Sequence, residues 1–173
     1  LRPGARKVVD LNGDGAITRD DIEYAGDASP RLAFGIKGGL EWRGIDVGVF
    51  FQGIGKQKIL RTGNMYAPWV VNYTRQNNTF IGKMWTPENP DAGYAISSRD
   101  AAFNRWNYQN KDISVQNNKY IRLKSLVIGY TLPKACTAKA GINNLRVYFS
   151  GDDLWEWTKV KDGYDPEYGE ASN

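Results

Sequence analysis

Two consecutive runs of alternating apolar and polar residues constrain the fold of this chain more than any other feature. In the first run, residues 31–42, the apolar side chains share one parity: Leu32, Phe34, Ile36, Leu40 and Trp42. The second run, residues 45–52, alternates in the same way. A period of two is typical of β-strands. Because only Arg43 and Gly44 separate the runs, the sequence predicts a β-hairpin over 31–52 with one apolar and one polar face.

Two further runs, 120–132 and 145–151, also alternate. In 120–132 the parity of the apolar residues changes near Ser125, which predicts a bulge. Between these runs, Pro133 and Gly141 flank a segment that suits one or two helical turns. Cys136 lies in this segment and is interpreted as a small packing residue, because the chain has no His to activate it. The sequence thus predicts an all-β protein with four antiparallel strands.

The apolar parity of the strands is the side that we expect to meet lipid or a protein core. If these strands span a membrane, the apolar side chains face outward because the opposite parity is charged or rich in Gly. The residues predicted to face outward are Phe34, Ile36, Leu40, Val47, Val49, Ile128 and Phe149.

Composition excludes several classes of function. The chain has 173 residues with no His and one Cys, so it cannot form a His/Cys zinc site, a Ser-His-Asp triad, a Cys-His dyad or a disulfide framework. The 23 basic and 19 acidic residues are interspersed, so we do not expect nucleic-acid binding. Nothing marks the carboxylates Asp152, Asp153 and Glu156 as a catalytic pair, and the chain is not expected to be an enzyme.

The connections between the strands are unequal in length. Short links follow Trp42 and Leu132, whereas long ones follow Phe51 and Trp155. Short turns on one rim, long loops on the other and strands of about ten alternating residues are typical of an outer-membrane β-barrel. A soluble antiparallel sandwich with one buried face would show the same alternation. The pattern alone leaves both folds open.

The segment 53–118 lacks sustained alternation but is too rich in aromatic residues for a disordered linker. We expect it to fold, with short hairpins around 69–73 and 80–85. Flat aromatic rings stack on sugar faces or peptide side chains, while Asn, Gln and Arg bond their polar edges. The candidate ligand-contacting residues are Trp69, Trp85, Trp106 and Tyr108. The same side chains could instead form a loop core, an interfacial aromatic girdle or a protein interface.

An acidic loop near the start of the chain has the spacing of a calcium-binding loop. The loop runs from Asp10, its first position, to Asp21, its twelfth. Oxygen-bearing side chains stand at positions 1, 3, 5 and 12, and Gly15 stands at the sharp turn. The predicted Ca²⁺ ligands are the side chains of Asp10, Asn12, Asp14 and Asp21 and the carbonyl of Ala16. The twelfth position is Asp rather than Glu, and no entering helix precedes the loop, so a lone dockerin-like loop is closer than an EF-hand pair. A turn held only by side-chain to backbone hydrogen bonds remains the alternative.

Several segments in a fixed order carry a resemblance to a known family. They are VDLNGDGAI (9–17) with Asp21, the strand opened by Ser29 and Pro30, WRGID (42–46), VFFQG (49–53), WTPENPDA (85–92), YIRLK (120–124), IGYTLP (128–133), LRVYFSG (145–151) and GYDPE (163–167). In this order they resemble the C-terminal part of the SusC/RagA family of TonB-dependent outer-membrane transporters of Bacteroidetes. The resemblance covers most of the chain and favours the barrel over the sandwich.

The resemblance implies four strands of a transmembrane β-barrel of about 22 strands, closed by a plug and covered by a SusD-like surface lipoprotein. Residues 1–30 and 53–118 would be extracellular loops, 31–52 a hairpin of the wall, 119–155 further wall strands around a periplasmic turn at 133–144, and 156–173 the start of another extracellular loop. The family's plug, TonB box and last strand have no counterpart here. Because four strands cannot close, we expect the remainder of the same barrel to come from a longer polypeptide or from other chains.

The function implied by the resemblance is uptake of oligosaccharides or peptides across the bacterial outer membrane, with loops exposed to the exterior. The implied partners are the SusD-like lipoprotein, the TonB complex, the nutrient ligand and the lipid bilayer. The alternative is a soluble calcium-stabilised carbohydrate-binding or dockerin-like module. That alternative requires a second sheet to cover the apolar parity.

Overall fold

A computed structural model describes residues 2–61, 78–96, 98–108, 112–161 and 163–168. The chain divides into two compact units. The sheet unit comprises residues 29–57 and 117–160, and the loop unit comprises 1–28, 58–116 and 161–173. None of the helices in these described ranges is long and apolar enough to cross a membrane.

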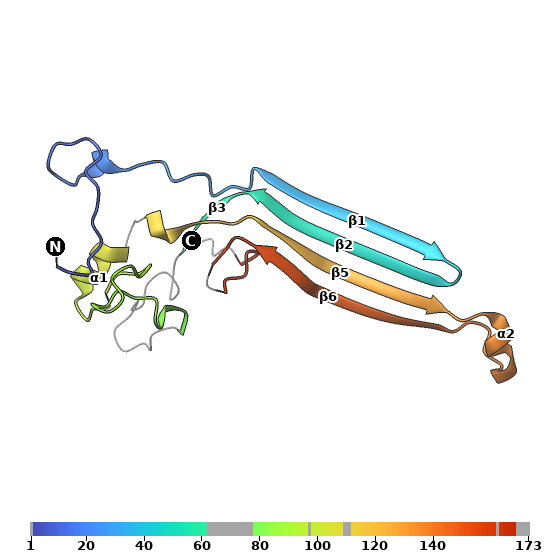
Figure 1. Cartoon of the computed structure of the whole chain (residues 1–173). Coiled ribbons are helices and arrows are strands. Elements are labelled where there is room, and N and C mark those ends of the chain that lie inside the picture. Colours follow the sequence, from blue (N-terminus) through green and yellow to red (C-terminus); the bar gives the residue numbers. More distant parts are fainter. Residues whose placement is uncertain (1, 62–77, 97, 109–111, 162, 169–173) are drawn as a thin grey trace. The chain divides into compact units, whose positions relative to one another are not determined.

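The sheet unit is built on four antiparallel strands in the order β1-β2-β5-β6 (Figure 1). Their bounds are Leu32–Trp42 for β1, Ile45–Lys56 for β2, Tyr120–Thr131 for β5 and Arg146–Thr158 for β6. The hairpin expected over 31–52 forms as β1 and β2, and β2 continues four residues further. Arg43 and Gly44 join them with φ angles of 47° and 84°, the two positive angles of a type I′ turn.

A short helical segment connects β5 to β6, as the sequence predicts. It consists of α2 (Lys134–Thr137) and a 3-10 turn, η5 (Ala138–Ala140). Gly141 ends it with a left-handed φ of 71°, the conformation that glycine adopts at least cost after a helix. Pro133 stands at the N-cap rather than at the first helical position. This segment and the β1–β2 turn lie at the same end of the sheet (Figure 1).

The strand register gathers the apolar side chains on one face of the sheet. Directly opposed residues share a face, and the pairing aligns Leu40 with Val47, Val47 with Ile128, and Ile128 with Phe149. All seven residues that the sequence predicts to face outward, Val47 among them, lie on this one face of the sheet. Leu40, Val147 and Phe149 are 67%, 61% and 56% exposed in the chain alone. We call this the apolar face and the opposite side the polar face.

Two neighbouring irregularities keep this face continuous. Phe50 pairs with Ser125 while Phe51 pairs with Leu123, so Lys124 is an extra residue of β5 relative to β2. On the other side of β5, Asp153 and Leu154 stand opposite Lys124. The shift at Lys124 is the bulge predicted near Ser125, and it returns Leu123 and Ile121 to the apolar face.

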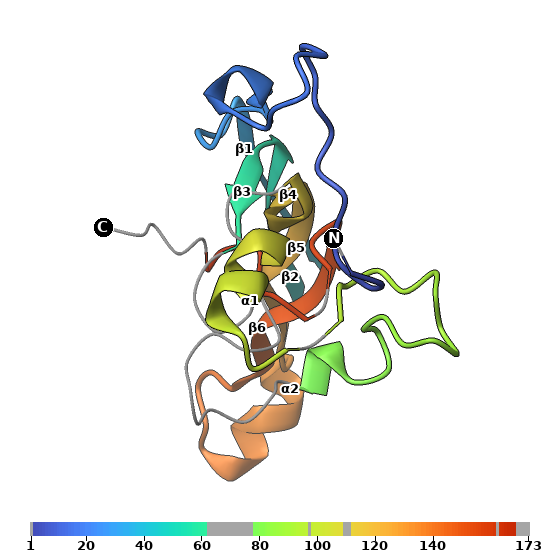
Figure 2. The same cartoon turned by 90° about the vertical axis from the view of Figure 1, so that its left-hand side faces the viewer.

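The loop unit holds short elements around a small core. They are η1 (Arg19–Asp21), β3 (Lys58–Leu60), η3 (Asn78–Phe80), α1 (Ala101–Tyr108) and η4 (Asp112–Ser114), and β3 pairs with β4 (Val115–Asn117; Figure 2). Phe80 and Tyr108 are almost fully buried. The Phe80 ring meets the Tyr94 ring edge-on, with centroids 4.9 Å apart.

The local structure of this unit differs from the expected hairpins. Around 80–85 the chain forms the turn η3 and then a single bridge between Met84 and Tyr94. The other expected hairpin, 69–73, lies outside the described residues. The carboxylate of Asp100 accepts hydrogen bonds from the backbone N–H groups of Ala102 and Phe103, at 2.9 and 3.2 Å, and so fixes the start of α1.

Candidate functional site

The polar face of the sheet carries ion pairs that connect neighbouring strands. Near the β1–β2 turn, Arg146 of β6 forms two hydrogen bonds with Asp46 of β2, with Nε–Oδ1 and Nη2–Oδ2 distances of 2.9 and 2.5 Å. Between these two strands lies Gly129 of β5. A Cβ atom there would approach Asp46 Oδ1 to 2.4 Å and Arg146 Nη2 to 2.5 Å. The glycine therefore leaves the space that the Arg146–Asp46 pair occupies.

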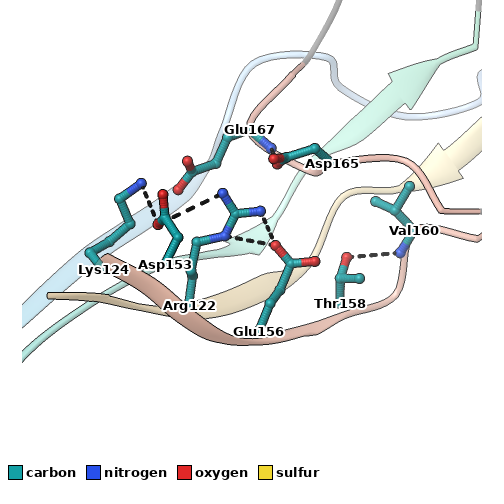
Figure 3. Close-up of polar contacts among 8 residues, drawn as sticks. All are labelled: Arg122, Lys124, Asp153, Glu156, Thr158, Val160, Asp165 and Glu167. Carbon is teal, nitrogen blue, oxygen red and sulfur yellow. Dashed lines mark hydrogen bonds and ion pairs between the residues drawn. The ribbon is translucent and has the colours of Figure 1, made fainter. Parts of the chain in front are cut away.

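A second group of charges lies at the bulges (Figure 3). The guanidinium of Arg122 donates to the carboxylate of Glu156, with an Nε–Oε2 distance of 2.7 Å and a second contact from Nη2. Lys124 Nζ lies 2.8 Å from Asp153 Oδ1, and Arg122 Nη1 lies 4.0 Å from the same oxygen. The Arg122 side chain is only 9% exposed, and its charge is balanced by these carboxylates. We call these four residues the bulge cluster.

Neither group of ion pairs was predictable from the sequence. The sequence shows the polar parity only as charged or rich in Gly. Asp46 and Arg146 are 100 residues apart in sequence, and their meeting depends on the register of three strands. The sequence shows that each strand carries charged residues, but it does not show which of them pair.

The acidic loop is held by its own side chains. Asp10 accepts hydrogen bonds from the backbone N–H groups of Gly13 and Gly15, each at 2.7 Å. Asn12 and Asp14 accept from the N–H groups two residues later, at 2.9 and 2.8 Å. These bonds fold residues 10–16 into consecutive turns of the kind that Asp and Asn favour.

Asp21 closes the loop from the far side. Its carboxylate accepts from the backbone N–H groups of Thr18 and Leu11, at 2.7 and 2.8 Å. These hydrogen bonds, the one from Thr18 above all, hold the pKa of Asp21 below its ordinary value. Asp21 is also the third residue of a capping box around η1, whose N-cap is Thr18.

The side-chain oxygen atoms of the predicted calcium site accept hydrogen bonds from the backbone of the loop. Asp10, Asn12, Asp14 and Asp21 all direct oxygens to backbone donors, which is the turn alternative that the sequence left open. In the described ranges, no three His, Cys, Asp or Glu side chains are grouped as a metal site. Carboxylate and amide oxygens are nevertheless the donors that Ca²⁺ prefers. Calcium binding, with Ala16 as carbonyl ligand, stays a prediction.

The structure separates the four candidate ligand-contacting aromatic residues. Trp69 lies outside the described residues. Tyr108 is 1% exposed and its hydroxyl donates to the carbonyl of Ala95 at 3.0 Å. Burial raises the pKa of this hydroxyl above its ordinary value. The Tyr108 ring is part of the loop core in this structure, and its contact with a ligand stays a prediction.

Trp85 and Trp106 contact the segment at the start of the chain. Trp85 is half-buried, and a Cβ atom at Gly4 would lie 2.6 Å from its ring, so only glycine allows this close approach. Trp106 donates from Nε1 to the carbonyl of Arg6 at 3.1 Å, and it is 39% exposed. Among the candidates that the structure describes, Trp106 presents the most accessible ring, and Trp85 has mainly a packing role.

Comparison with known proteins identifies relatives for nearly the whole chain. No family model matches it. It is 30% identical over 163 residues to TonB-dependent receptor P26 of Formosa agariphila, covering 91% of this chain and 16% of the receptor. It is also 30% identical over 169 residues to TonB-dependent receptor P3 of the same organism, covering 95% of this chain and 16% of that receptor.

Solved structures share the fold. The RagAB peptide transporter has a TM-score of 0.64 at 20% identity, covering 89% of this chain and 17% of that chain. The RagAB peptide importer in its closed-closed state has a TM-score of 0.63 at 21% identity, covering 95% of this chain and 18% of that chain. The four antiparallel strands therefore have the fold of an outer-membrane barrel wall.

The curated relatives give the chain its family. It spans about 16% of the length of each, and their names denote receptors rather than enzymes. Its fold and its identity to these receptors agree over the same residues, and the chain therefore corresponds to a segment of a TonB-dependent receptor.

Proposed function

We propose that this chain supplies four adjacent wall strands and part of the outer loops of a TonB-dependent nutrient importer in the bacterial outer membrane. The observation that carries the proposal is the two-faced sheet in a chain with 30% identity to TonB-dependent receptors. The apolar face is exposed in the chain alone, as expected of a surface that meets lipid. The polar face carries compensated ion pairs, as expected of a surface that meets the lumen or plug.

The soluble-module alternative lacks the surface it needs. A sandwich covers its apolar face with a second sheet of similar size. Besides the four-stranded sheet, the described residues form one sheet, in which β3 and β4 have three residues each. Within the described residues, no sheet of similar size is formed that could cover the exposed apolar residues of these strands: Ile36, Leu40, Ile45, Ile128, Val147 and Phe149. We therefore retain the importer alone.

The proposed ligand is an oligosaccharide or a peptide. RagAB, whose fold this chain shares, is named as a peptide transporter and importer. The aromatic residues of the loop unit suit a peptide or an oligosaccharide. Trp106 is the best-placed candidate among the described residues, with Trp69 proposed from the sequence. The family resemblance adds a SusD-like lipoprotein over the loops, and energy from the TonB complex acting on the remainder of the same barrel and its plug.

Orientation gives a direct test of this proposal. Cys136, interpreted from the sequence as a packing residue, is in fact exposed in the α2 turn. Ile81, 63% exposed, lies in the loop unit. The test uses a full-length receptor engineered to keep Cys136 and no other cysteine. A membrane-impermeant maleimide should label this protein only after the outer membrane is permeabilised. With Ile81→Cys in a Cys136→Ser background, the same reagent should label intact cells.

Two outcomes would contradict the proposal. Labelling of Cys136 in intact cells would place the short turn outside and reverse the topology. Recovery of the receptor in the soluble fraction, with both cysteines reactive, would exclude a membrane wall.

Growth of a deletion strain and its parent on starch oligosaccharides and on a casein digest would distinguish the two ligand classes.

A further inference from the structure

A hollow lies on the apolar face near the end of the sheet that carries the β1–β2 turn and α2. It has a volume of about 810 Å³ and is lined chiefly by apolar side chains from β2, β5 and β6 and the turn that follows β5: Ile45, Ile128, Tyr130, Leu132, Val147 and Phe149. Ile45, Tyr130 and Val147 form one row across three strands, and Ile128 and Phe149 belong to the next row. We call this hollow the face groove.

The turns beside the face groove are basic. Residues 43–44 and 132–145 contain three cations, Arg43, Lys134 and Lys139, and no carboxylate. All three are exposed, and none forms an ion pair within the described ranges. The nearby Arg146 differs, because it is paired with Asp46 on the polar face.

Arg43 is held at the edge of the apolar face. Its guanidinium lies over the Trp42 ring, 4.9 Å from the centroid. Trp42 pairs with Ile45, which lines the face groove, so the ring and the groove belong to the same face. A cation that covers an aromatic ring beside an apolar surface has the arrangement of residues at a membrane–water boundary. Lys134 begins α2 two residues after Leu132, another lining residue.

We propose that this end of the sheet binds an anionic phospholipid, with an acyl chain in the face groove and the headgroup phosphate at Arg43, Lys134 and Lys139. The inference rests on the proposed function, because it requires the apolar face to lie in a bilayer. An apolar groove matches an acyl chain, and a guanidinium matches a phosphate through parallel hydrogen bonds. Three cations without a carboxylate favour a lipid of net negative charge over a zwitterionic one.

Spin-labelled lipids can measure this preference in the full-length receptor. The receptor is reconstituted in phosphatidylcholine vesicles with a trace of labelled phosphatidylglycerol or labelled phosphatidylcholine. The immobilised component of each electron paramagnetic resonance spectrum gives the relative association of the two lipids with the protein. We expect phosphatidylglycerol to associate several-fold more strongly than phosphatidylcholine.

Two variants separate the site from general electrostatic attraction. The triple variant Arg43→Gln, Lys134→Gln, Lys139→Gln should bring the two lipids to equal association. The matched control, Lys56→Gln, Lys119→Gln, Lys159→Gln, removes three cations from the opposite end of the same sheet unit and should keep the preference. A third variant, Ile45→Trp, fills the face groove without changing charge and should reduce phosphatidylglycerol association.

The possible contrary results have different meanings. An immobilised component with no preference for phosphatidylglycerol would overturn this inference and leave the importer intact. The same would follow if the control triple variant lost the preference as fully as the turn variant, or if Ile45→Trp changed nothing. If neither lipid gave an immobilised component, the membrane-wall proposal itself would be contradicted.

Discussion

Lys124 and Asp153 meet where two adjacent strands each depart from regular pairing, with Nζ and Oδ1 2.8 Å apart. Lys124 is the extra residue of β5 relative to β2, and Asp153 has a left-handed φ of 51° opposite it. Bulges redirect side chains locally, and these two gather Arg122, Lys124, Asp153 and Glu156 on the polar face. The irregularities thus keep one face apolar and concentrate charge on the other.

The bulge cluster predicts unequal effects of removing its two carboxylates. Glu156→Gln leaves the nearly buried Arg122 without its main counter-charge and should destabilise the folded receptor by about 1–3 kcal/mol. Asp153 is half exposed, so Asp153→Asn should cost about 0–1 kcal/mol. Urea unfolding of the reconstituted receptor, followed by gel mobility, measures both. Equal costs would show that burial of Arg122 does not set the strength of the cluster.

Neighbouring residues of β2 provide a matched test of the two faces. Val47→Arg places a cation on the apolar face and should destabilise the receptor by about 2–4 kcal/mol if the position lies near the bilayer midplane. Gly48→Arg places the same side chain on the polar face, where no atom lies within 4 Å of an added Cβ, and should cost far less. The same unfolding assay compares them. A larger cost at Gly48 would reverse the assignment of the faces.

The acidic loop should lose order in acid. Because the folded-state pKa of Asp21 is lowered, its contribution to stability is complete above the unfolded pKa and is lost as pH falls through the folded value. The protection factors of the Leu11 and Thr18 amides, which are corrected for the intrinsic pH dependence of exchange, should therefore fall below about pH 4. In Asp21→Asn, exchange should already be faster at neutral pH and should lack this acid step. An unchanged exchange rate in Asp21→Asn would mean that the carboxylate does not hold the loop.

Calcium binding to the same loop is an independent prediction. Titration calorimetry of the receptor should show Ca²⁺ binding that Asp14→Ala abolishes, since Asp14 supplies a predicted ligand. Asp20→Asn is a suitable control, because Asp20 lies in the same loop but outside the predicted ligands. Absence of Ca²⁺ binding, with thermal stability unaffected by a chelator, would reduce the loop to a turn.

Two aromatic residues of the loop unit should differ in role: Tyr108 is buried in the core, whereas Trp106 is exposed and is a candidate for ligand contact. Tyr108→Ala removes a buried ring and its hydrogen bond to Ala95, and should destabilise the unit by about 3–5 kcal/mol. Trp106→Ala should leave proteolytic resistance of the loops near the parental level and reduce uptake of the nutrient. If Trp106→Ala unfolds the loops as Tyr108→Ala does, its role is structural. If it changes neither property, the proposed ligand contact is wrong.

The strands were predictable from sequence wherever alternation is unbroken. The parity change near Ser125 revealed the bulge in β5, because a single extra residue reverses the face of everything before it. The end of β6 was concealed for a different reason, because Asp153 stands where the alternation calls for an apolar residue. The expected end at 151 was too early, since Asp153 interrupts the period and Trp155 and Trp157 resume it.

The contacts within the loop unit and across the sheet could not be predicted in the same way. The pairing of Asp46 with Arg146 depends on two strand registers, which hydrophobic pattern alone does not give. Tyr108 lies in a segment without periodicity, so its burial depends on tertiary contacts with residues such as Ala95 and Ser114. In the acidic loop the hydrogen bonds of the turn alternative are local, so they can be inferred from the spacing of Asp and Asn, whereas calcium binding by the same residues stays a prediction.

If β2 lies in the barrel wall with one face in lipid, the accessibility of spin labels should alternate along this strand. Single cysteines at positions 45 to 50 of the full-length receptor, in bilayers, are labelled and probed with oxygen and with a water-soluble nickel complex. We expect labels at Ile45, Val47 and Val49 to be more accessible to oxygen, and labels at Asp46 and Gly48 to be more accessible to nickel. Accessibility without a period of two, or with the opposite parity, would contradict this placement of β2.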